Sequence, residues 1–208
     1  MKLYYCRTGY FYFSYTKFHL EAAHMRSLIF AINITPDGFC DHRAVVADGG
    51  LQDFYTELLK NADTVLFGRK TFQLFESYWP GVARGTKGKA EEREFATIIN
   101  KLPKIVFSHH SLSTYWANTI VQRTLDVNVL SDIKRRSGKD ILLLGSPGIG
   151  EQLKKLDLID KYYFVIQPLI AGKGKRLFES FELAKGSNLN MSEIKTFSSG
   201  AVAIGYGK

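Results

Sequence analysis

The 208 residues, 45% of them hydrophobic and 23% charged, describe a globular chain that can bury a sizeable core as one domain, and no apolar run reaches membrane-spanning length. The net charge of +8 makes nucleic acid a candidate partner, but the basic residues are scattered and no nucleic-acid motif occurs, so we expect no such partner. Cys6 and Cys40 form neither a metal-ligand spacing nor a disulfide framework, which predicts no metal site and a cytoplasmic location.

Residues 1–24 differ from the rest of the chain. Eight of the first twenty residues are Tyr or Phe, yet the stretch lacks the apolar centre and the small-residue cleavage site of a secretory signal. We expect a leader that comes from a tag or from translation upstream, followed by a single domain over 25–208. The alternative is an additional strand, since "YFYFSYTKF" is rich in aromatic β-formers.

Strands and helices alternate through the first half of the domain. The apolar run 27–34 predicts a buried strand, and the turn "TPDG" follows it. Residues 50–60 place their apolar side chains on one helical face, which predicts a helix. The segment 63–68 is typical of a short strand, and 70–78 of a helix that must end before Pro80.

The second half continues the alternation and ends in two strands. The predicted helices cover 91–100, 125–136 and 148–157. The predicted strands cover 104–108, 140–145 and a long segment, 161–170, with a closing hairpin made of 189–197 and 201–208. This order predicts an α/β fold in three layers, in which helices flank a central mixed, mostly parallel sheet that ends in a C-terminal β-hairpin.

Three loops that suit an anion follow predicted strands, at the edge where α/β sheets bind ligands. "FGRKT" at 67–71 places two cations and a hydroxyl group at the start of a helix. "VFSHH" at 106–110 places a serine and two histidines after a strand. "LLLGSPGIGEQL" at 142–153 has glycines that permit close approach of a pyrophosphate, although it matches neither a Walker loop nor the dinucleotide fingerprint.

Together with their order, these segments resemble the dihydrofolate reductase superfamily over residues 26–207, and within it the branch of the C-terminal reductase domain of bacterial riboflavin biosynthesis. The motifs that carry the resemblance are "AINITPDGF", "TVLFGRKTF", "KIVFS", "ILLLGSPGIGEQL" and "IQPLIAGKGKRLF". The resemblance implies an NADPH-dependent reductase. The cofactor-binding residues that it implies are Ala31, Gly68, Arg69, Lys70, Thr71, Ser108, His109, Gly145, Ser146, Pro147 and Gly148.

The resemblance also implies positions for the substrate and for a proton donor. The proton-donating carboxylate lies on the first helix of the family, and Asp53 is the candidate here, although Gln52 occupies the strictest alignment. An aspartate in a first helical turn is equally well explained by the helix dipole. Asp37 belongs to the loop that covers the nicotinamide. Trp79 lies at the substrate entrance, where it either stacks on a planar heterocycle or packs under the loop.

Two departures from the family pattern argue against a true dihydrofolate reductase. Leu102 occupies about the position of the arginine that binds the glutamate tail of folate, and Val165 the position of a threonine that orients the pterin. We therefore expect a small planar heterocycle, pyrimidine- or pterin-like, as the substrate. The zinc motifs of the deaminase half of the bifunctional riboflavin enzymes do not occur in these residues. The alternative function is a nucleotide-binding or regulatory protein without catalysis, and the riboflavin branch implies a homodimer.

Overall fold

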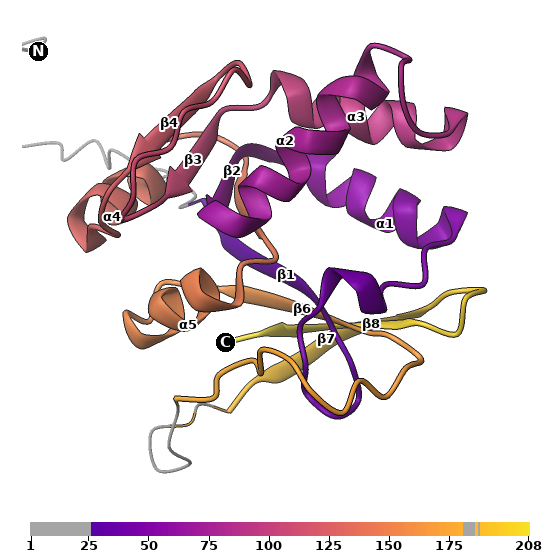
Figure 1. Cartoon of the computed structure of the whole chain (residues 1–208). Helices are drawn as coiled ribbons and strands as arrows, with labels where there is room; N and C mark the ends of the chain where they lie inside the picture. The colour runs from indigo at the N-terminus through magenta and orange to yellow at the C-terminus, as the bar shows by residue number, and fades with distance from the viewer. Residues whose placement is uncertain (1–25, 181–185, 187) are drawn as a thin grey trace, which may run out of the picture.

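The computed structural model describes residues 26–180, 186 and 188–208 of the chain, so the leader and its alternative strand lie outside the described residues. Eight strands form one sheet in the order β4-β3-β2-β5-β1-β6-β8-β7 (Figure 1). The strands are β1 (Leu28–Ile34), β2 (Ala62–Gly68), β3 (Lys104–Phe107), β4 (Thr119–Gln122), β5 (Asp140–Leu144), β6 (Lys161–Ile166), β7 (Asn190–Thr196) and β8 (Val202–Gly207). The first six are joined by parallel pairings, whereas β8 is antiparallel to β6 and β7. The predicted fold class, including its C-terminal hairpin, is confirmed.

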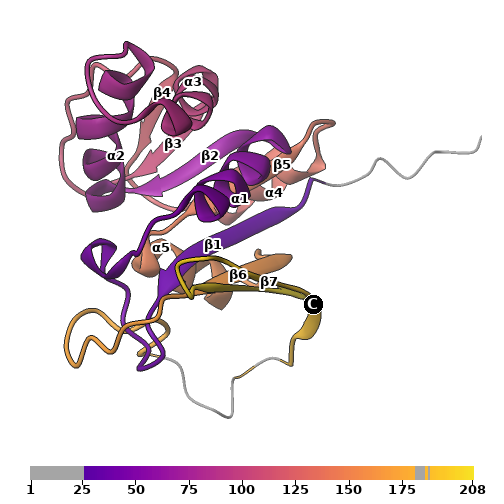
Figure 2. The same ribbon diagram turned by 90° about the vertical axis from the view of Figure 1, so that its right-hand side faces the viewer.

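Helices cover both faces of this sheet and complete the three layers. They are α1 (Gly49–Lys60), α2 (Arg69–Ala83), α3 (Arg93–Lys101), α4 (Val127–Arg135) and α5 (Pro147–Lys155), with short 3-10 helices at η1 (His42–Ala44) and η2 (Ala90–Glu92). One apolar cluster joins the sheet to α1, α2 and α3, and a second joins it to α4 and α5. In Figure 2, α2 and α3 gather with β3 and β4 at one end of the sheet, and β6 and β7 lie at the other.

The predicted end of the second helix before Pro80 is wrong. The helix α2 continues through Pro80 to Ala83, although proline cannot donate the backbone hydrogen bond of its turn. Val82 is fully buried in that last turn, and the Trp79 ring packs against Phe95 with centroids 4.3 Å apart. Burial of these side chains stabilises the turn enough to offset the missing bond.

Two strand predictions also need correction. The long strand expected over 161–170 ends at Ile166, because Pro168 has no N–H for the sheet ladder and the segment after it turns away from the sheet. The structure has a strand that the sequence did not predict, β4, which pairs in parallel with β3 at the edge of the sheet. Its four residues are only partly covered, so they carry no periodic apolar pattern.

The contact between α5 and β1 leaves no space for a side chain at Gly150. A Cβ there would lie 2.5 Å from the Phe30 ring, which is fully buried and held by edge contacts with the Tyr162 and Phe178 rings. We expect Gly150→Ala to lower the free energy of unfolding by about 1–3 kcal/mol, despite the better helix propensity of alanine. Gly148→Ala is the matched control, since nothing lies within 4 Å of its Cβ position. Urea unfolding curves that coincide for both variants would contradict this packing.

Candidate functional site

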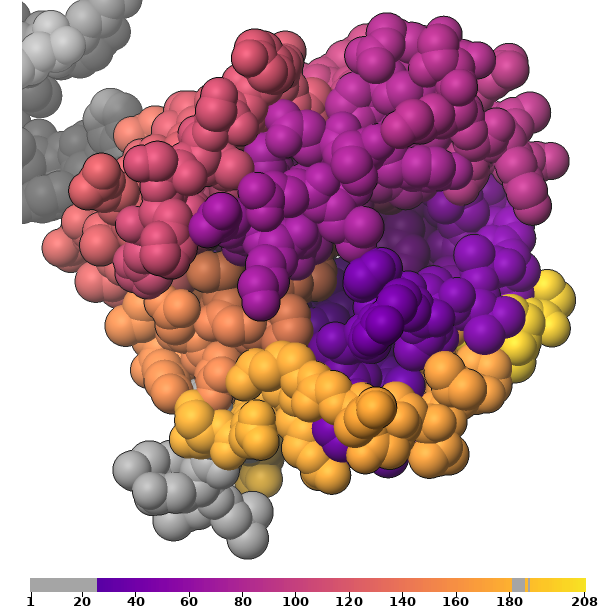
Figure 3. Space-filling view, viewed as in Figure 1, coloured from indigo at the N-terminus to yellow at the C-terminus, as the bar shows by residue number. Residues whose placement is uncertain are grey.

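A cavity of about 1140 Å³ opens at the carboxyl ends of β1, β2, β3 and β5. It is lined by α1, α2 and α3 on one side and by the start of α5 on the other. Figure 3 shows the hollow where the indigo residues that follow β1 meet the magenta surface of α2 and the orange chain. All eleven residues expected to bind the cofactor line this cavity, and so does Trp79. The structure thus brings together three loops that are far apart in the sequence.

The helices α2 and α5 begin at this cavity without a side-chain cap, and so does α3, which follows directly on η2. The first turn of α1 also lines the cavity but is capped by the carboxylate of Asp48, and α4, which begins elsewhere, is capped by that of Asp126. In contrast, no side chain accepts from the first N–H groups of α2 or α5. The hydroxyl of Ser146, the residue that precedes α5, instead accepts from the backbone N–H of Gly68 at 2.7 Å and so joins the two loops. In the first turn of α5 the Ile149 N–H donates to the Ser146 carbonyl at 3.0 Å and Pro147 has no N–H, so the Gly148 N–H is the free one there. Together with the first N–H groups of α2 it suits an anion with more than one phosphate.

The turn before α5 keeps its backbone open to the cavity. Gly145 and Ser146 are both left-handed, with φ of 57° and 59°, and the Gly145 N–H donates to the carbonyl of Ala31 at 2.8 Å. The left-handed backbone conformation costs free energy at a residue with a side chain such as Ser146. The hydrogen bond from the Gly68 N–H to the Ser146 hydroxyl helps to stabilise this conformation. Pro147 stands in the first turn of α5, where its missing N–H is no loss. Gly148 is exposed and has free space where a side chain would lie, which suits close approach of a pyrophosphate.

The first turn of α2 supplies the cations of the site. Arg69 lines the cavity, and its Nε atom is buried without a hydrogen-bond partner. Lys70 is exposed at the rim, and Thr71 lies against Gly145 of the neighbouring loop. An orphaned buried guanidinium nitrogen costs free energy until an acceptor reaches it, and a phosphate oxygen is such an acceptor. The residues present therefore fit a phosphorylated cofactor.

The loop after β3 lies beside the first turn of α2, because β3 and β2 are neighbours in the sheet. Ser108 is buried, and its hydroxyl donates to the carbonyl of His110 at 2.7 Å. This hydrogen bond stabilises the loop and occupies the hydroxyl proton. His109 and His110 are exposed at the rim of the cavity. The group of this loop best placed to donate to a phosphate is thus the His109 imidazole rather than the Ser108 hydroxyl.

The two predicted carboxylates lie outside the lining of the cavity. Asp53 is exposed on α1, whereas its neighbour Gln52 lines the cavity. Successive helical residues differ by about 100° in direction, so one position decides which of the two faces the site. This placement does not suit the proton-donating role predicted for Asp53. The helix-dipole interpretation does not apply either, because α1 begins at Gly49, is capped by Asp48 and has no acidic residue in its first turn.

Asp37 connects two loops at the edge of the site. Its carboxylate accepts from the Thr35 hydroxyl at 2.5 Å and from the backbone N–H groups of Gly172 and Ala171 at 2.7 and 3.2 Å. The Thr35 hydroxyl and the Gly172 amide lower the pKa of Asp37 to about 2. Asp37 therefore tethers the loop after β1 to the loop after β6, and the structure gives it no direct place in the cavity wall.

Aromatic and polar groups from α1, α2 and α3 complete the wall. Trp79 both lines the cavity and packs on Phe95, so the two sequence-based interpretations of this residue are compatible. Asn33 and Tyr55 also line the cavity, and the sequence analysis assigned neither of them to the site. Both are polar residues among apolar ones, Asn33 in the strand β1 and Tyr55 on the buried face of α1. This pattern is the signal that could have identified them as residues of the site.

We expect Asp53→Asn to leave both the folding and the activity of the protein nearly unchanged, because the side chain is exposed and lies outside the cavity wall. The measurement is kcat for the reduction that the family resemblance implies, together with the thermal midpoint of unfolding. A loss of more than about tenfold in kcat at an unchanged midpoint would restore the carboxylate as the proton donor.

Among the described residues, no helix is long and apolar enough to cross a membrane, and no three His, Cys, Asp or Glu side chains gather in a way that could hold a metal ion.

A protein of Bacillus subtilis is similar to most of the chain. The chain is 31% identical over 189 residues to the uncharacterized protein YyaP of Bacillus subtilis, and this alignment covers 87% of the chain and 94% of YyaP.

Two solved structures share the fold. A putative riboflavin biosynthesis protein from Shewanella sp. PV-4 superposes with a TM-score of 0.63 at 18% identity, covering 87% of this chain and 98% of that one. A diaminohydroxyphosphoribosylaminopyrimidine deaminase/5-amino-6-(5-phosphoribosylamino)uracil reductase from Thermotoga maritima superposes with a TM-score of 0.60 at 17% identity, covering 88% of this chain and 56% of that one. The family described as the RibD C-terminal domain matches residues 26–203. The chain therefore belongs to the RibD C-terminal domain family.

Proposed function

We propose that the protein is an NADPH-dependent reductase that transfers a hydride to a small planar heterocycle, pyrimidine- or pterin-like. The observation that carries this proposal is the pair of uncapped helix N-termini at one cavity, joined by the hydrogen bond from Gly68 to Ser146 and flanked by the unpartnered Arg69 Nε. Membership of the RibD C-terminal domain family supports a reductase. The cavity volume of about 1140 Å³ is above the usual range for one drug-sized ligand, which supports room for both a dinucleotide and a substrate.

In this proposal the residues of the chain bind and orient, and NADPH supplies the hydride. The free N–H groups at the start of α2 and the Gly148 N–H of α5 would bind the pyrophosphate, and Arg69 with His109 would bind the 2′-phosphate. The backbone of Ala31, in the middle of β1, would face the nicotinamide. The aromatic wall of α1, α2 and α3 excludes water from the space over the ring. All of these residues bind or orient the cofactor and none of them reacts, as expected where the cofactor supplies the hydride.

The proposal is tested in two steps. NADPH and NADH are first titrated against the protein by fluorescence, and we expect NADPH to bind more tightly. NADPH oxidation at 340 nm is then followed with a panel of pyrimidinediones, flavins and pterins, and we expect turnover with at least one of them. A protein that binds neither cofactor at millimolar concentration would overturn the proposal.

One observation favours a second candidate, a nucleotide-binding or regulatory protein without catalysis. The α1 side chain at the cavity wall next to Asp53 is the neutral Gln52, so the predicted carboxylate does not reach the site. The same two steps separate the candidates. Tight NADPH binding without oxidation by any member of the panel would favour the regulatory protein.

We also propose that the protein is a homodimer that associates through β7. This strand pairs only with β8 in the described sheet, and all seven of its residues are exposed. Met191 and Ile194 on it are 61% and 56% exposed, which leaves apolar surface at an unpaired sheet edge. We expect light scattering at micromolar concentration to give about twice the chain mass of 23.5 kDa, and Ile194→Lys to shift the protein to the monomer. A monomeric mass for the unaltered protein would reject the proposal.

A further inference from the structure

Two polar side chains of α1 lack a partner at the wall of the cavity. Among the described residues, four buried side-chain nitrogen or oxygen atoms have no hydrogen-bond partner. Three of them, Gln52 Nε2, Tyr55 OH and Arg69 Nε, belong to residues that line the cavity. Gln52 and Tyr55 lie three positions apart on α1 and therefore on one side of the helix. Buried polar groups in proteins nearly always make a hydrogen bond. Two buried groups without one at the same wall therefore indicate that a ligand binds there.

Both groups are hydrogen-bond donors. An amide nitrogen such as Gln52 Nε2 only donates. Burial raises the pKa of the Tyr55 phenol, so it keeps its proton at neutral pH and can donate as well. The Asn33 side chain lies close enough to the Tyr55 hydroxyl to lower its pKa, as a donating amide does, and it leaves the phenol proton without an acceptor. A ligand that satisfies this wall must present acceptors.

The rest of this wall is apolar and carries no cation. Leu51, Phe75, Trp79 and Phe95 line it, with the Phe75 and Trp79 rings 6.1 Å apart. Beyond the first turn of α2, no described Lys or Arg of α1, α2 or α3 lines the cavity. The charged side chain that does line it there is Glu92, whose carboxylate accepts from the Tyr78 hydroxyl at 2.8 Å. Lys175 lines the cavity from the loop after β6 and does not belong to these helices. A phosphate or carboxylate group seated against this wall would therefore find no cation on the wall itself and would face a carboxylate.

We propose that this wall binds an uncharged heterocycle that presents carbonyl oxygens to Gln52 and Tyr55 and places an apolar, unphosphorylated substituent against the aromatic side chains. The proposal rests on the proposed reductase function and specifies the substrate class of that site. It assigns Gln52 and Tyr55 as the residues that determine specificity. A ring that presents a protonated amidine edge, with N–H groups at both positions, meets donors with donors, and its recognition needs a carboxylate that Gln52 does not provide.

The test uses probes of matched shape. Phenyluracil and phenyl-diaminopyrimidine share their shape and differ at the ring edge, which carries carbonyl and ring N–H groups in the first and amino groups and bare ring nitrogens in the second. A phenyluracil with a phosphate on its phenyl ring keeps the carbonyls and adds only the phosphate. Each is titrated by calorimetry against the NADPH-loaded protein. We expect phenyluracil to bind at least about tenfold more tightly than either of the others. Equal or reversed affinities would overturn the proposal.

Gln52→Glu provides the sharper experiment, because it replaces the donor by a carboxylate of the same size. We expect it to reverse the preference, so that phenyl-diaminopyrimidine binds more tightly than phenyluracil. Tyr55→Phe should weaken phenyluracil by about three- to tenfold. Asp53→Asn, on the exposed side of the same helix, is the control and should leave all affinities unchanged.

The outcomes separate this inference from the proposed function. NADPH affinity is measured for every variant, and we expect Gln52→Glu and Tyr55→Phe to retain it. If NADPH binds but the ring preference does not reverse in Gln52→Glu, the assignment of Gln52 is wrong while the cofactor site stands. If NADPH does not bind, the probes are titrated against the free protein, and the same preference and the same reversal decide the proposal.

Discussion

Arg69→Ala is expected to weaken NADPH binding by about 10- to 150-fold and NADH binding far less. Arg69 is the first residue of α2 and follows Gly68, which has no side chain that could cap the helix. Arg69 lines the cavity, and its Nε atom is buried without a hydrogen-bond partner. A charge-assisted bond to a phosphate contributes about 1.5–3 kcal/mol, and the planar guanidinium can make two such bonds in parallel. Since NADH lacks the 2′-phosphate, the alanine variant should lose most of the discrimination between the two cofactors.

Fluorescence titration of both cofactors measures this effect. Arg69→Lys should retain part of the affinity, because it keeps the charge and loses the fork-shaped geometry. Arg84→Ala is the matched control, since Arg84 is an exposed arginine at the other end of α2 and outside the cavity lining. An NADPH affinity that stays the same in Arg69→Ala, or that falls no more than the NADH affinity, would show that the 2′-phosphate binds elsewhere.

The second large effect concerns the substrate: we expect dihydrofolate to be a very poor hydride acceptor. The resemblance to dihydrofolate reductases implies an arginine for the glutamate tail near Leu102, which here is half-buried and packs against the core. Lys104 cannot replace this arginine, because it is buried and its ammonium donates to the carbonyls of Ile99 and Leu102 at 2.9 and 2.7 Å. The remaining nearby cation, Lys101, is exposed and lacks the planar fork that pairs with a carboxylate.

Recognition of the pterin ring is missing as well. Val165, at the position of the orienting threonine, is fully buried in the apolar core. On α1 the cavity is lined by the neutral Gln52, and the carboxylate of Asp53 lies outside it. Loss of a bidentate tail contact and of a ring-orienting hydrogen bond should weaken folate recognition by roughly 3–5 kcal/mol, or more than a hundredfold. NADPH oxidation with dihydrofolate at tens per second and a micromolar KM would refute this prediction.

The sequence by itself predicted the architecture and the loops that meet at the cavity. Seven of the eight strands were expected from it: the inner strands because helices bury them on both faces and they need continuous apolar residues, and the closing hairpin from its partial alternation and its turn "SSG". Glycine-containing turns after β2 and β5 identified the loops that meet at the cavity, since parallel strands carry their carboxyl ends to one edge. These features depend on short segments of the chain, and so a local pattern is sufficient to predict them.

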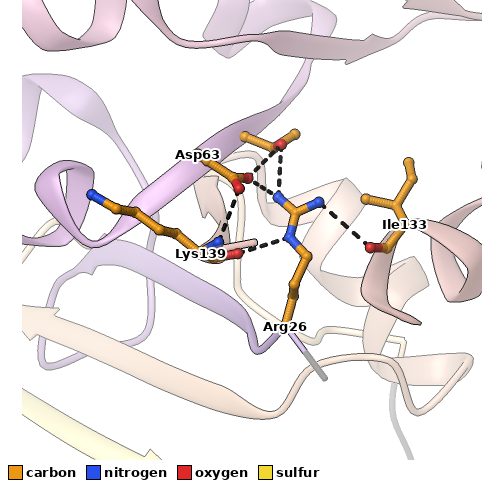
Figure 4. A network of polar contacts seen from close by, with 5 residues as sticks. Arg26, Asp63, Ile133 and Lys139 are labelled. Atoms are coloured by element: carbon orange, nitrogen blue, oxygen red, sulfur yellow. Dashed lines mark hydrogen bonds and ion pairs between the residues drawn. The ribbon is translucent and has the colours of Figure 1, made fainter. Parts of the chain in front are cut away.

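Interactions between segments that lie far apart in the sequence could not be predicted from it. Arg26, at the start of β1, donates to the Thr64 hydroxyl at 2.9 Å and to the Lys139 carbonyl at 2.7 Å, and it pairs with Asp63 (Figure 4). Asp48 caps α1, and its carboxylate also accepts from the Ser199 N–H at 2.6 Å, which joins α1 to a turn about 150 residues away. Neither contact leaves a trace in the local pattern of charges.

The same limit applies to the choice between two adjacent residues of α1. The sequence indicated a polar residue near the start of this helix, and the choice between Gln52 and Asp53 depended on the rotation of the helix about its axis. That rotation is decided by burial of Leu51, Phe54 and Leu58 against the sheet, which turns Gln52 toward the cavity and Asp53 toward solvent. A one-residue change in register moves a helical side chain by about 100°, so only the packed tertiary structure determines which of two adjacent side chains meets the ligand.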